Sequence, residues 1–305
     1  KSGNDVVLTS TGTKLANIGK MTITPEGKVS TELVNGYTEV DAETDAFVKN
    51  IQAQFSDKLN EVVAKSNVDL VVNDPETGKR LIRNQETNLG DLCADAYRDQ
   101  SGADIAFVNG GGIRTDIAPG DITYNNLVSV FPFGNELCVV EATGQEILDA
   151  LELGARAVPT ESGGFLQVSG LSYEIHTYID SSVQLDENGM FLSVDGEYRV
   201  KNVQVAGQAL DLEKTYTVAS HNYLVKNCGD GYTMLATAET IAEFPNMEEL
   251  VMQFITDHPG YIAQVEGRIL QTETAVALPT DKEEPVTSET VATTYTVQPG
   301  DSLWH

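Results

Sequence analysis

Apolar residues recur at two different spacings along this chain. Between residues 41 and 65 they fall every three to four positions, which predicts one long helix of about six turns with a single buried face. The runs at 165–176, 198–205 and 215–220 are typical of strands. Helices mixed with hairpins predict an α+β domain between about residues 70 and 272, with mixed β-sheets layered with helices and the long helix as a connector before it. The apolar stripe predicted on that helix is Phe47, Ile51, Phe55, Leu59 and Val62 or Val63.

Polar residues mark the expected starts of three further helices. Asn88 precedes a helical apolar pattern and is predicted to cap it. Thr143 with Glu146, and Asn246 with Glu249, have the spacing of a capping box, in which the two side chains satisfy each other's free backbone N–H groups. Helices are therefore expected to begin at all three places.

Two glycine-rich passages interrupt the apolar pattern. In the first, the buried run Ile105–Val108 ends in Asn109, three glycines at 110–112 and then Arg114. Glycine accepts positive φ and has no Cβ, so bare backbone is expected to approach a ligand there. The alternative is a tight turn with a surface arginine. The second passage, 222–232, holds Gly229-Asp230-Gly231.

Charge and cysteine content restrict the partners. The 305 residues carry 46 acidic and 19 basic side chains, which gives a formal charge of −27. This charge disfavours nucleic-acid polymers and anionic membranes as partners. Any anionic ligand would have to be bound by a local group of arginines. The three cysteines imply no disulfide framework and do not decide the compartment. No run approaches the ~18 apolar residues of a membrane span. The chain begins at Lys1 without an initiator methionine, and we expect it to be a piece of a longer protein.

The residues beside the glycines are those of a nucleotide pocket. The aromatic faces of Phe133 and Tyr223 can stack on a base, Arg83 and Arg114 can bind phosphate, and Asp230 can accept hydrogen bonds from ribose hydroxyls. The competing interpretation makes the two aromatic residues part of the core and Asp230 a turn former.

Catalytic and metal-binding residues are not apparent. The four histidines are far apart in sequence, and none has the spacing of a metal ligand. His221, next to the second glycine passage, is the one candidate acid or base, and a satisfied histidine at a strand end is the alternative. We therefore predict no catalytic residue and no metal in this chain.

Five passages in a fixed order identify a family. Over residues 70–270 the chain resembles the C-terminal substrate-binding domain of the 5'-nucleotidase, UDP-sugar hydrolase and 2',3'-cyclic-nucleotide phosphodiesterase family, in a bacterial, exported form. The matching passages are Glu86-Thr87-Asn88-Leu89-Gly90-Asp91-Leu92, Asn109-Gly110-Gly111-Gly112-Ile113-Arg114, Phe131-Pro132-Phe133-Gly134-Asn135, Gly164-Phe165-Leu166-Gln167-Val168-Ser169-Gly170 and Gly229-Asp230-Gly231-Tyr232.

The resemblance implies a function for each pocket residue. The base is expected between Phe133 and Tyr223, facing Asn109, with Asp230 on the ribose. Two arginines would hold ribose and phosphate. The complete substrate site implied is Arg83, Asn109, Gly111, Gly112, Arg114, Phe133, Asn135, Tyr223 and Asp230.

The resemblance also implies a domain order. Residues 1–40 would be the last strands of a metallophosphatase domain, 41–69 the connector helix, 70–272 the nucleotide-binding domain and 273–293 a solvated linker. Residues 294–305 resemble the truncated start of a LysM module, which binds peptidoglycan when complete. Family catalysis belongs to the metallophosphatase domain and its two divalent ions, of the zinc or manganese type, whose motifs this chain lacks.

These expectations lead to one functional hypothesis and one alternative. The chain is expected to be the substrate-recognition part of an extracellular, metal-dependent phosphohydrolase of a bacterial cell wall, which converts nucleotides to nucleosides and phosphate. By itself it should be inactive. The alternative is a non-catalytic, wall-associated binding or adhesion module that keeps the fold.

Overall fold

The computed structural model describes residues 8–12 and 16–274. The predicted LysM start and nearly all of the predicted linker lie outside these residues. Of the helices that the structure describes, none is both long and apolar enough to cross a bilayer.

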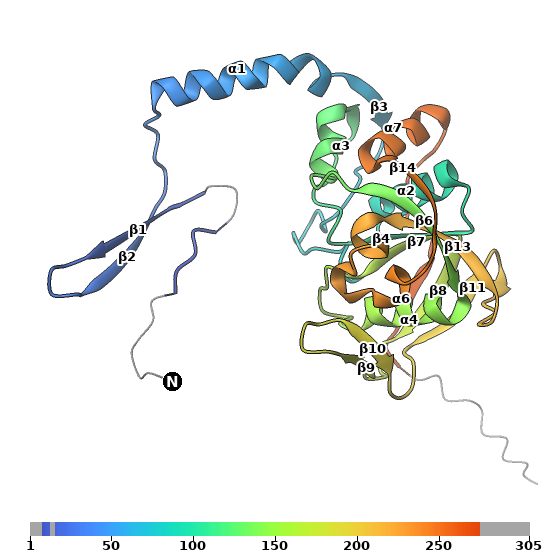
Figure 1. Cartoon of the computed structure of the whole chain (residues 1–305). Helices are drawn as coiled ribbons and strands as arrows, with labels where there is room; N and C mark the ends of the chain where they lie inside the picture. Colours follow the sequence, from blue (N-terminus) through green and yellow to red (C-terminus); the bar gives the residue numbers. More distant parts are fainter. Residues whose placement is uncertain (1–7, 13–15, 275–305) are drawn as a thin grey trace, which may run out of the picture.

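The centre of the fold is a five-stranded mixed sheet with the strand order β14-β6-β13-β4-β7 (Figure 1). Strands β13 and β4 run parallel, and the other neighbours are antiparallel. Ile105 and Phe107 of β4 enter one core, whereas Ala106 and Val108 enter another, so the uninterrupted apolar run reflects a strand that is covered on both faces. The five strands are β4 (Ile105–Asn109), β6 (Glu136–Thr143), β7 (Leu166–Ser169), β13 (Thr215–His221) and β14 (Thr240–Asn246).

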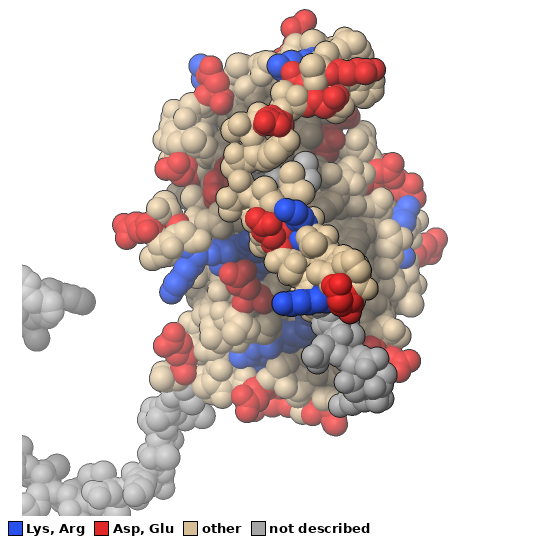
Figure 2. All heavy atoms as spheres, turned by 90° about the vertical axis from the view of Figure 1, so that its left-hand side faces the viewer, with Lys and Arg blue, Asp and Glu red and all other residues tan. Residues whose placement is uncertain are grey.

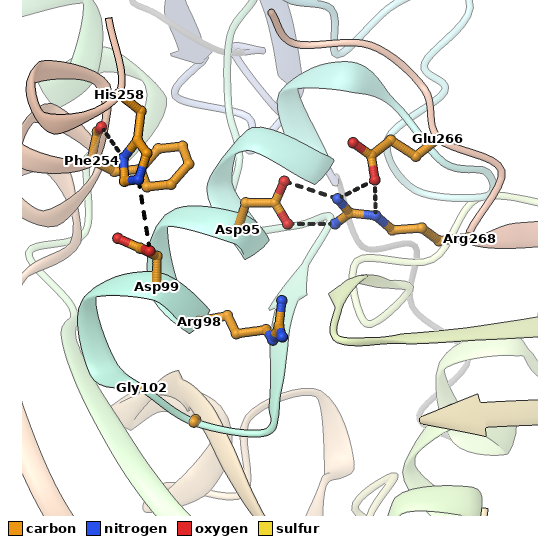
Figure 3. Close-up of a pocket in the computed structure, with 9 residues that line it drawn as sticks. Asp95, Arg98, Asp99, Gly102, Phe254, His258, Glu266 and Arg268 are labelled. Carbon is orange, nitrogen blue, oxygen red and sulfur yellow. Dashed lines mark hydrogen bonds and ion pairs between the residues drawn. The ribbon is translucent and has the colours of Figure 1, made fainter. Parts of the chain in front are cut away.

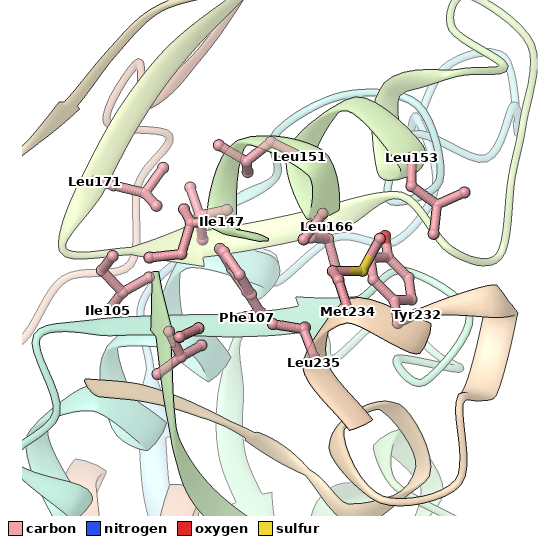
Figure 4. Close-up of a cluster of buried hydrophobic side chains, with 14 of the residues drawn as sticks. Ile105, Phe107, Ile147, Leu151, Leu153, Leu166, Leu171, Tyr232, Met234 and Leu235 are labelled. Atoms are coloured by element: carbon pink, nitrogen blue, oxygen red, sulfur yellow. The ribbon is translucent and has the colours of Figure 1, made fainter. Parts of the chain in front are cut away.

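Helices and a second sheet cover the two faces. Helices α2 (Asn88–Ser101), α3 (Tyr124–Val130) and α7 (Met247–Asp257) surround the core that holds Ala106. Helix α4 (Gly144–Ala155) lies against the other core, where Phe107, Ile147 and Leu151 pack together (Figure 4). The second sheet adds to this core in the order β12-β11-β8-β15. Its strands are β8 (Leu171–His176), β11 (Val200–Val205), β12 (Gln208–Ala209) and β15 (Ile269–Thr272).

Short elements complete the domain and confirm the predicted α+β class. The hairpin β9 (Val183–Leu185) and β10 (Phe191–Val194) is separate from the larger sheets. The second glycine-rich passage forms α5 (Asn222–Val225), a 3₁₀ turn (Gly229–Gly231) and α6 (Thr233–Ala236).

The predicted helix over 41–65 is too long. Helix α1 spans Ala42–Leu59, and the chain then forms strand β3 (Val62–Ser66), which pairs with β5 (Gly120–Thr123). The β-branched Val62 and Val63 fit a strand pairing better than a further helical turn, and this pairing ends the helix.

The single buried face predicted for that helix is also wrong within the described residues. Helix α1 has no buried residue, and Phe47, Ile51 and Phe55 are all exposed. The hairpin before it, β1 (Ile18–Ile23) and β2 (Val29–Val34), has no buried residue either, and Figure 1 shows both elements beside the domain rather than on it.

The predicted caps have mixed outcomes. Thr143 and Glu146 form the capping box of α4 as predicted. The cap of α2 is Thr87, whose hydroxyl accepts from the Gly90 N–H, whereas Asn88 accepts from the Val71 N–H at 3.0 Å. Helix α7 does begin after Asn246, but this side chain makes no capping hydrogen bond, so the predicted capping box with Glu249 does not form.

Candidate functional site

The site lies where two parallel strands end. Because β4 and β13 are parallel neighbours, their last residues, Asn109 and His221, lie at the same edge of the sheet. The first glycine-rich passage follows β4 and the second follows β13, so residues far apart in the sequence meet there. The carboxyl edge of parallel strands is a common place for ligand sites.

A cavity of about 570 Å³ opens between the two glycine-rich passages. Eight of the nine predicted site residues line it, together with Gly163, which the sequence analysis missed. Gly163 is followed by Gly164 in the loop before β7, and this pair of glycines is the sequence feature that could have indicated it. The lining residues are Arg83, Asn109, Gly111, Gly112, Phe133, Asn135, Gly163, Tyr223 and Asp230.

Arg114, the ninth predicted residue, lies beside the cavity. Its Nη1 donates to the Gly111 carbonyl at 3.1 Å, and its guanidinium carbon lies 5.7 Å from the centre of the Phe133 ring. This distance allows a cation–π contact between Arg114 and the ring that is predicted to stack on a ligand.

The two aromatic rings are accessible. Phe133 is 57% exposed and Tyr223 38% exposed, so the interpretation of both as core residues is wrong. A large exposed aromatic side chain beside a cavity is available to a ligand, and contact with water is unfavourable for such a ring, so a ligand that covers it would be stabilised.

Three of the residues that line the cavity are joined by hydrogen bonds. Asn109 Nδ2 donates to Asp230 Oδ2 at 2.6 Å. The Tyr223 hydroxyl donates to Asp230 Oδ1 at 3.2 Å. Asp230 thus holds residues from both passages, and its φ of 52° places it in the left-handed region, which aspartate tolerates better than most side chains. Asp230 is therefore a turn residue, as the competing interpretation has it, and it also lines the cavity.

His221 is not in contact with the cavity. It is fully buried, and its Nε2 lies 2.8 Å from Asn109 Oδ1. Burial lowers the pKa of His221 to about 4, so the ring is neutral at pH 7. A neutral ring behind the cavity wall contradicts the acid or base hypothesis for His221. It agrees with the strand-end alternative in position, but only one ring nitrogen is satisfied, because Nδ1 has no hydrogen-bond partner among the described residues.

The glycines of the first passage are required for space rather than for positive φ. Among the three, none has φ in the left-handed region, contrary to the expectation. A Cβ on Gly110 would lie 2.1 Å from the Ile82 carbonyl oxygen, and one on Gly112 would lie 2.7 Å from Asn109 Oδ1. In the second passage, a Cβ on Gly229 would meet the Tyr223 ring at 2.3 Å. Close packing explains these positions.

Positive charge is concentrated near the cavity of this acidic protein. Burial lowers the pKa of Arg83, and the nearby charges of Arg80 and Arg114 lower it further. Figure 2 shows Lys and Arg side chains gathered in the middle of one face, with acidic side chains around them. The three guanidinium groups repel one another, and Glu161, 3.5 Å from Arg80, and Asp230 offset part of this repulsion. An anion bound between the arginines would relieve the rest.

A second hollow, of about 600 Å³, lies between α2 and α7 (Figure 3). Arg268, which is half-buried, is already paired with Asp95 at 2.8 Å and with Glu266 at 2.8 Å. A second arginine of its wall, Arg98, donates from Nε to the Asp104 carbonyl at 3.2 Å. Asp99 adds a further carboxylate to its wall. This hollow therefore offers less to an anionic ligand than the cavity at the strand ends.

The Arg268 cluster contains an unusual carboxyl group. Asp91 is fully buried, and burial raises the pKa of its carboxyl group to about 8. The positive charge of Arg268 opposes this increase, whereas the negative charge of Glu86 adds to it. The Arg268 Nη1 is 3.8 Å from Asp91 Oδ1, too far for a hydrogen bond. Asp91 is therefore protonated at neutral pH in the folded chain.

This protonation makes stability depend on pH. The pKa of aspartate is about 3.9 in an unfolded chain, so between about pH 4 and pH 8 the folded chain holds the proton more tightly, and the free energy of unfolding falls as pH rises. In Asp91→Asn we expect this decline to disappear. Denaturant titrations at pH 6.5 and pH 8 should show the unaltered chain losing stability relative to Asp91→Asn by up to about 1.4 kcal/mol per pH unit. Equal losses in the two proteins would contradict the raised pKa.

Taken together, the fold and the cavity define a class: an α+β domain whose cavity, at the ends of two parallel strands, is lined by aromatic rings, a carboxylate and an arginine. The 5'-nucleotidase, C-terminal domain model matches residues 62–237, more than half of the chain. The chain belongs to this family.

Individual relatives agree with this assignment. The chain is 33% identical over 216 residues to a 5'-nucleotidase of Vibrio parahaemolyticus, and the aligned region covers 71% of this chain and 30% of that protein. It is 30% identical over 243 residues to the cell wall protein Lmo0130 of Listeria monocytogenes, covering 74% of this chain and 29% of that protein. The chain thus spans about a third of the length of these curated relatives.

A solved structure has the same fold. The 5'-nucleotidase precursor of Thermus thermophilus aligns with a TM-score of 0.64 and 27% identity, over 84% of this chain and 55% of that one. The resemblance inferred from the five passages is therefore confirmed at the level of family and fold.

Proposed function

We propose that this domain binds nucleotides for a 5'-nucleotidase-like phosphohydrolase, an enzyme that converts nucleotides to nucleosides and phosphate. The observation that carries the proposal is the cavity itself. It joins two accessible aromatic rings to a carboxylate and to Arg83, with Arg114 beside it, at the edge where two parallel strands end. The 5'-nucleotidases among the relatives support the same function.

Each part of a nucleotide has a partner in this cavity. The base stacks on Phe133 and Tyr223, whose rings are both exposed, and its edge meets Asn109. The Asp230 carboxylate accepts from the ribose hydroxyls, and Arg83 and Arg114 bind the phosphate. These residues bind and orient the ligand, and we assign none of them a catalytic step.

We place the metal chemistry outside this chain's described residues. Among residues 8–12 and 16–274, no group of three or more His, Cys, Asp or Glu side chains could hold a metal ion. In our proposal two divalent ions, of the zinc or manganese type, belong to another part of the protein and supply an activated water there. The cavity residues present the phosphate to that part.

The N-terminal elements fit such a second part. The β1–β2 hairpin places Met21, Ile23 and Leu33 on one exposed face, and α1 has an exposed apolar stripe of its own. We propose that residues 1–40 belong to the adjoining metallophosphatase domain, with residues 41–69 connecting it to the nucleotide-binding domain. Burial of these apolar faces against that domain would explain their composition.

We further propose an extracellular, cell-wall location in a bacterium. The similarity to the Listeria cell wall protein supports it. Residues 294–305, the predicted LysM start, would contribute to peptidoglycan binding in a complete module. A wall-associated binding module without nucleotide affinity remains the competing function, and Lmo0130 is the relative that favours it.

The test is a titration of the 305-residue chain with AMP by calorimetry, combined with an assay of phosphate release in the presence of Zn²⁺ or Mn²⁺. We expect binding without turnover. Phe133→Ala should weaken binding by about 1–3 kcal/mol through the lost stacking surface. Phe47→Ala is the matched control, because Phe47 is 64% exposed on α1 and does not line the cavity.

Each other outcome has a clear meaning. Rapid metal-dependent phosphate release would contradict the division of labour between this chain and a missing part. Absence of binding in the unaltered chain would favour the wall-associated module. Equal affinities for Phe133→Ala and Phe47→Ala would show that the Phe133 ring does not touch the base.

A further inference from the structure

His221 lies directly behind the wall of the cavity. It is the last residue of β13, the neighbour of β4, whose last residue is Asn109. The histidine is fully buried, and its Nε2 is 2.8 Å from Asn109 Oδ1. Its other ring nitrogen, Nδ1, has no hydrogen-bond partner among the described residues. The ring therefore makes one polar contact with the site, and this contact is to a residue of the cavity.

The neighbours of Asn109 determine which way its amide faces. One amide atom is 2.6 Å from Asp230 Oδ2, and a carboxylate oxygen accepts hydrogen bonds, so this atom is the nitrogen. The amide oxygen then faces His221, which requires Nε2 to carry the ring proton. The reverse orientation would bring the amide oxygen against the carboxylate of Asp230.

The oxygen side of the amide has little room. A Cβ on Gly112 would lie 2.7 Å from Asn109 Oδ1, so a side chain at residue 112 would crowd this atom. The oxygen of Asn109 faces the ring of His221 at 2.8 Å, and Asn109 as a whole is only 3% exposed. Only the amide nitrogen, with one N–H committed to Asp230, has a hydrogen left for a ligand.

We propose that His221 is a positioning residue of the ligand cavity, which fixes the Asn109 amide so that it offers a ligand a hydrogen-bond donor and no acceptor. The ligand is a nucleoside or nucleotide, so this inference rests on the proposed function. The base edge that meets Asn109 must then carry an acceptor, such as a ring nitrogen or a carbonyl oxygen. His221 selects among bases without touching them.

The first test needs no ligand and no variant. Long-range ¹H–¹⁵N NMR spectra of the intact chain at pH 7 report which ring nitrogen of His221 carries the proton. We expect a proton on Nε2 and none on Nδ1. A proton on Nδ1 would reverse the Asn109 amide and overturn the inference.

The second test measures selectivity. Adenosine and its 1-deaza, 3-deaza and 7-deaza analogues, each lacking one ring acceptor, are titrated against the unaltered chain, His221→Gln and His221→Leu. In the unaltered chain we expect one analogue to bind roughly fivefold more weakly than adenosine, the cost of one hydrogen bond. His221→Gln keeps an N–H near the position of Nε2 and should keep this preference, whereas His221→Leu removes it and should lose the preference.

The controls separate positioning from a purely structural function. Circular dichroism must first show that each variant is folded. A folded His221→Leu variant with the selectivity of the unaltered chain would overturn the inference, even if its melting temperature falls. If His221→Leu does not fold, loss of the preference in folded His221→Gln, or a proton on Nδ1, would overturn it. If the unaltered chain binds neither AMP nor any of the four nucleosides, the proposed function and the ligand half of this inference both fail, and the NMR result decides the positioning half alone.

Discussion

Replacing Gly110 by alanine is expected to destabilise the folded chain by about 3 kcal/mol, the upper range for overpacking a well-packed interior. The new Cβ would lie 2.1 Å from the Ile82 carbonyl oxygen and 2.9 Å from the Ile82 carbonyl carbon. Both neighbours are backbone atoms, so no side chain can rotate away. The Gly110 N–H also donates to the Phe165 carbonyl at 2.7 Å, which holds the glycine in place.

The same variant should disturb the cavity. The third neighbour of the new Cβ is the Arg83 Cα at 3.2 Å, so relief of the clash would displace an arginine of the candidate site. Urea denaturation monitored by circular dichroism measures the loss of stability, and a titration with AMP measures the loss of affinity.

Gly260→Ala is the matched control for this variant. Nothing lies within 4 Å of a Cβ built at Gly260, and its φ is not in the left-handed region. We expect its stability to remain within about 0.5 kcal/mol of the unaltered chain. If Gly110→Ala is as stable as Gly260→Ala, the backbone around Ile82 yields easily, and close packing does not explain the glycine at position 110.

The Asp230→Asn variant is expected to weaken nucleoside binding by about 1.5–3 kcal/mol, the contribution of a hydrogen bond to a charged group. Asparagine also tolerates the left-handed backbone of this residue, so the loop should keep its shape. Its amide oxygen can still accept from Asn109, and its amide nitrogen can donate to the Tyr223 hydroxyl. What the substitution removes is the negative charge and one acceptor at the cavity.

A control variant and a paired ligand make this test specific. Asp195→Asn removes a carboxylate from an exposed residue that does not line the cavity, and it should bind adenosine as the unaltered chain does. Because we place Asp230 on the ribose hydroxyls, the unaltered chain should prefer adenosine to 2',3'-dideoxyadenosine, and Asp230→Asn should lose most of this preference. An unchanged preference in Asp230→Asn would place Asp230 away from the sugar.

These two variants address separate properties of the same site. Gly110 contributes space for the backbone of the first glycine-rich passage, and Asp230 contributes charge from the second. A loss of stability in the first variant without a loss in the second would show that the packing of the site and its chemistry can be separated.

The sequence by itself determined the elements with a strong local cause. The capping box of α4 depends on Thr143 and Glu146, which are close in sequence, and it formed as predicted. Family membership also followed from the sequence, because the five ordered passages are contiguous strings of residues. The sequence failed where a distant pairing competed with a local preference. Pairing with β5 made Val62–Ser66 a strand, although the apolar spacing continued that of the helix.

Only the tertiary structure decided how the candidate site is built. The sequence singled out Arg83, Asn109, Phe133, Tyr223 and Asp230, but it could not show that they share one cavity, because their proximity depends on β4 and β13 being parallel neighbours. The structure also explained the glycines by space instead of backbone angle, and it moved His221 from a possible catalytic group to the back of the cavity wall. The physical reason is the same in each case: close packing and hydrogen bonding act between atoms that are near in space, and the order of residues along the chain does not contain these distances.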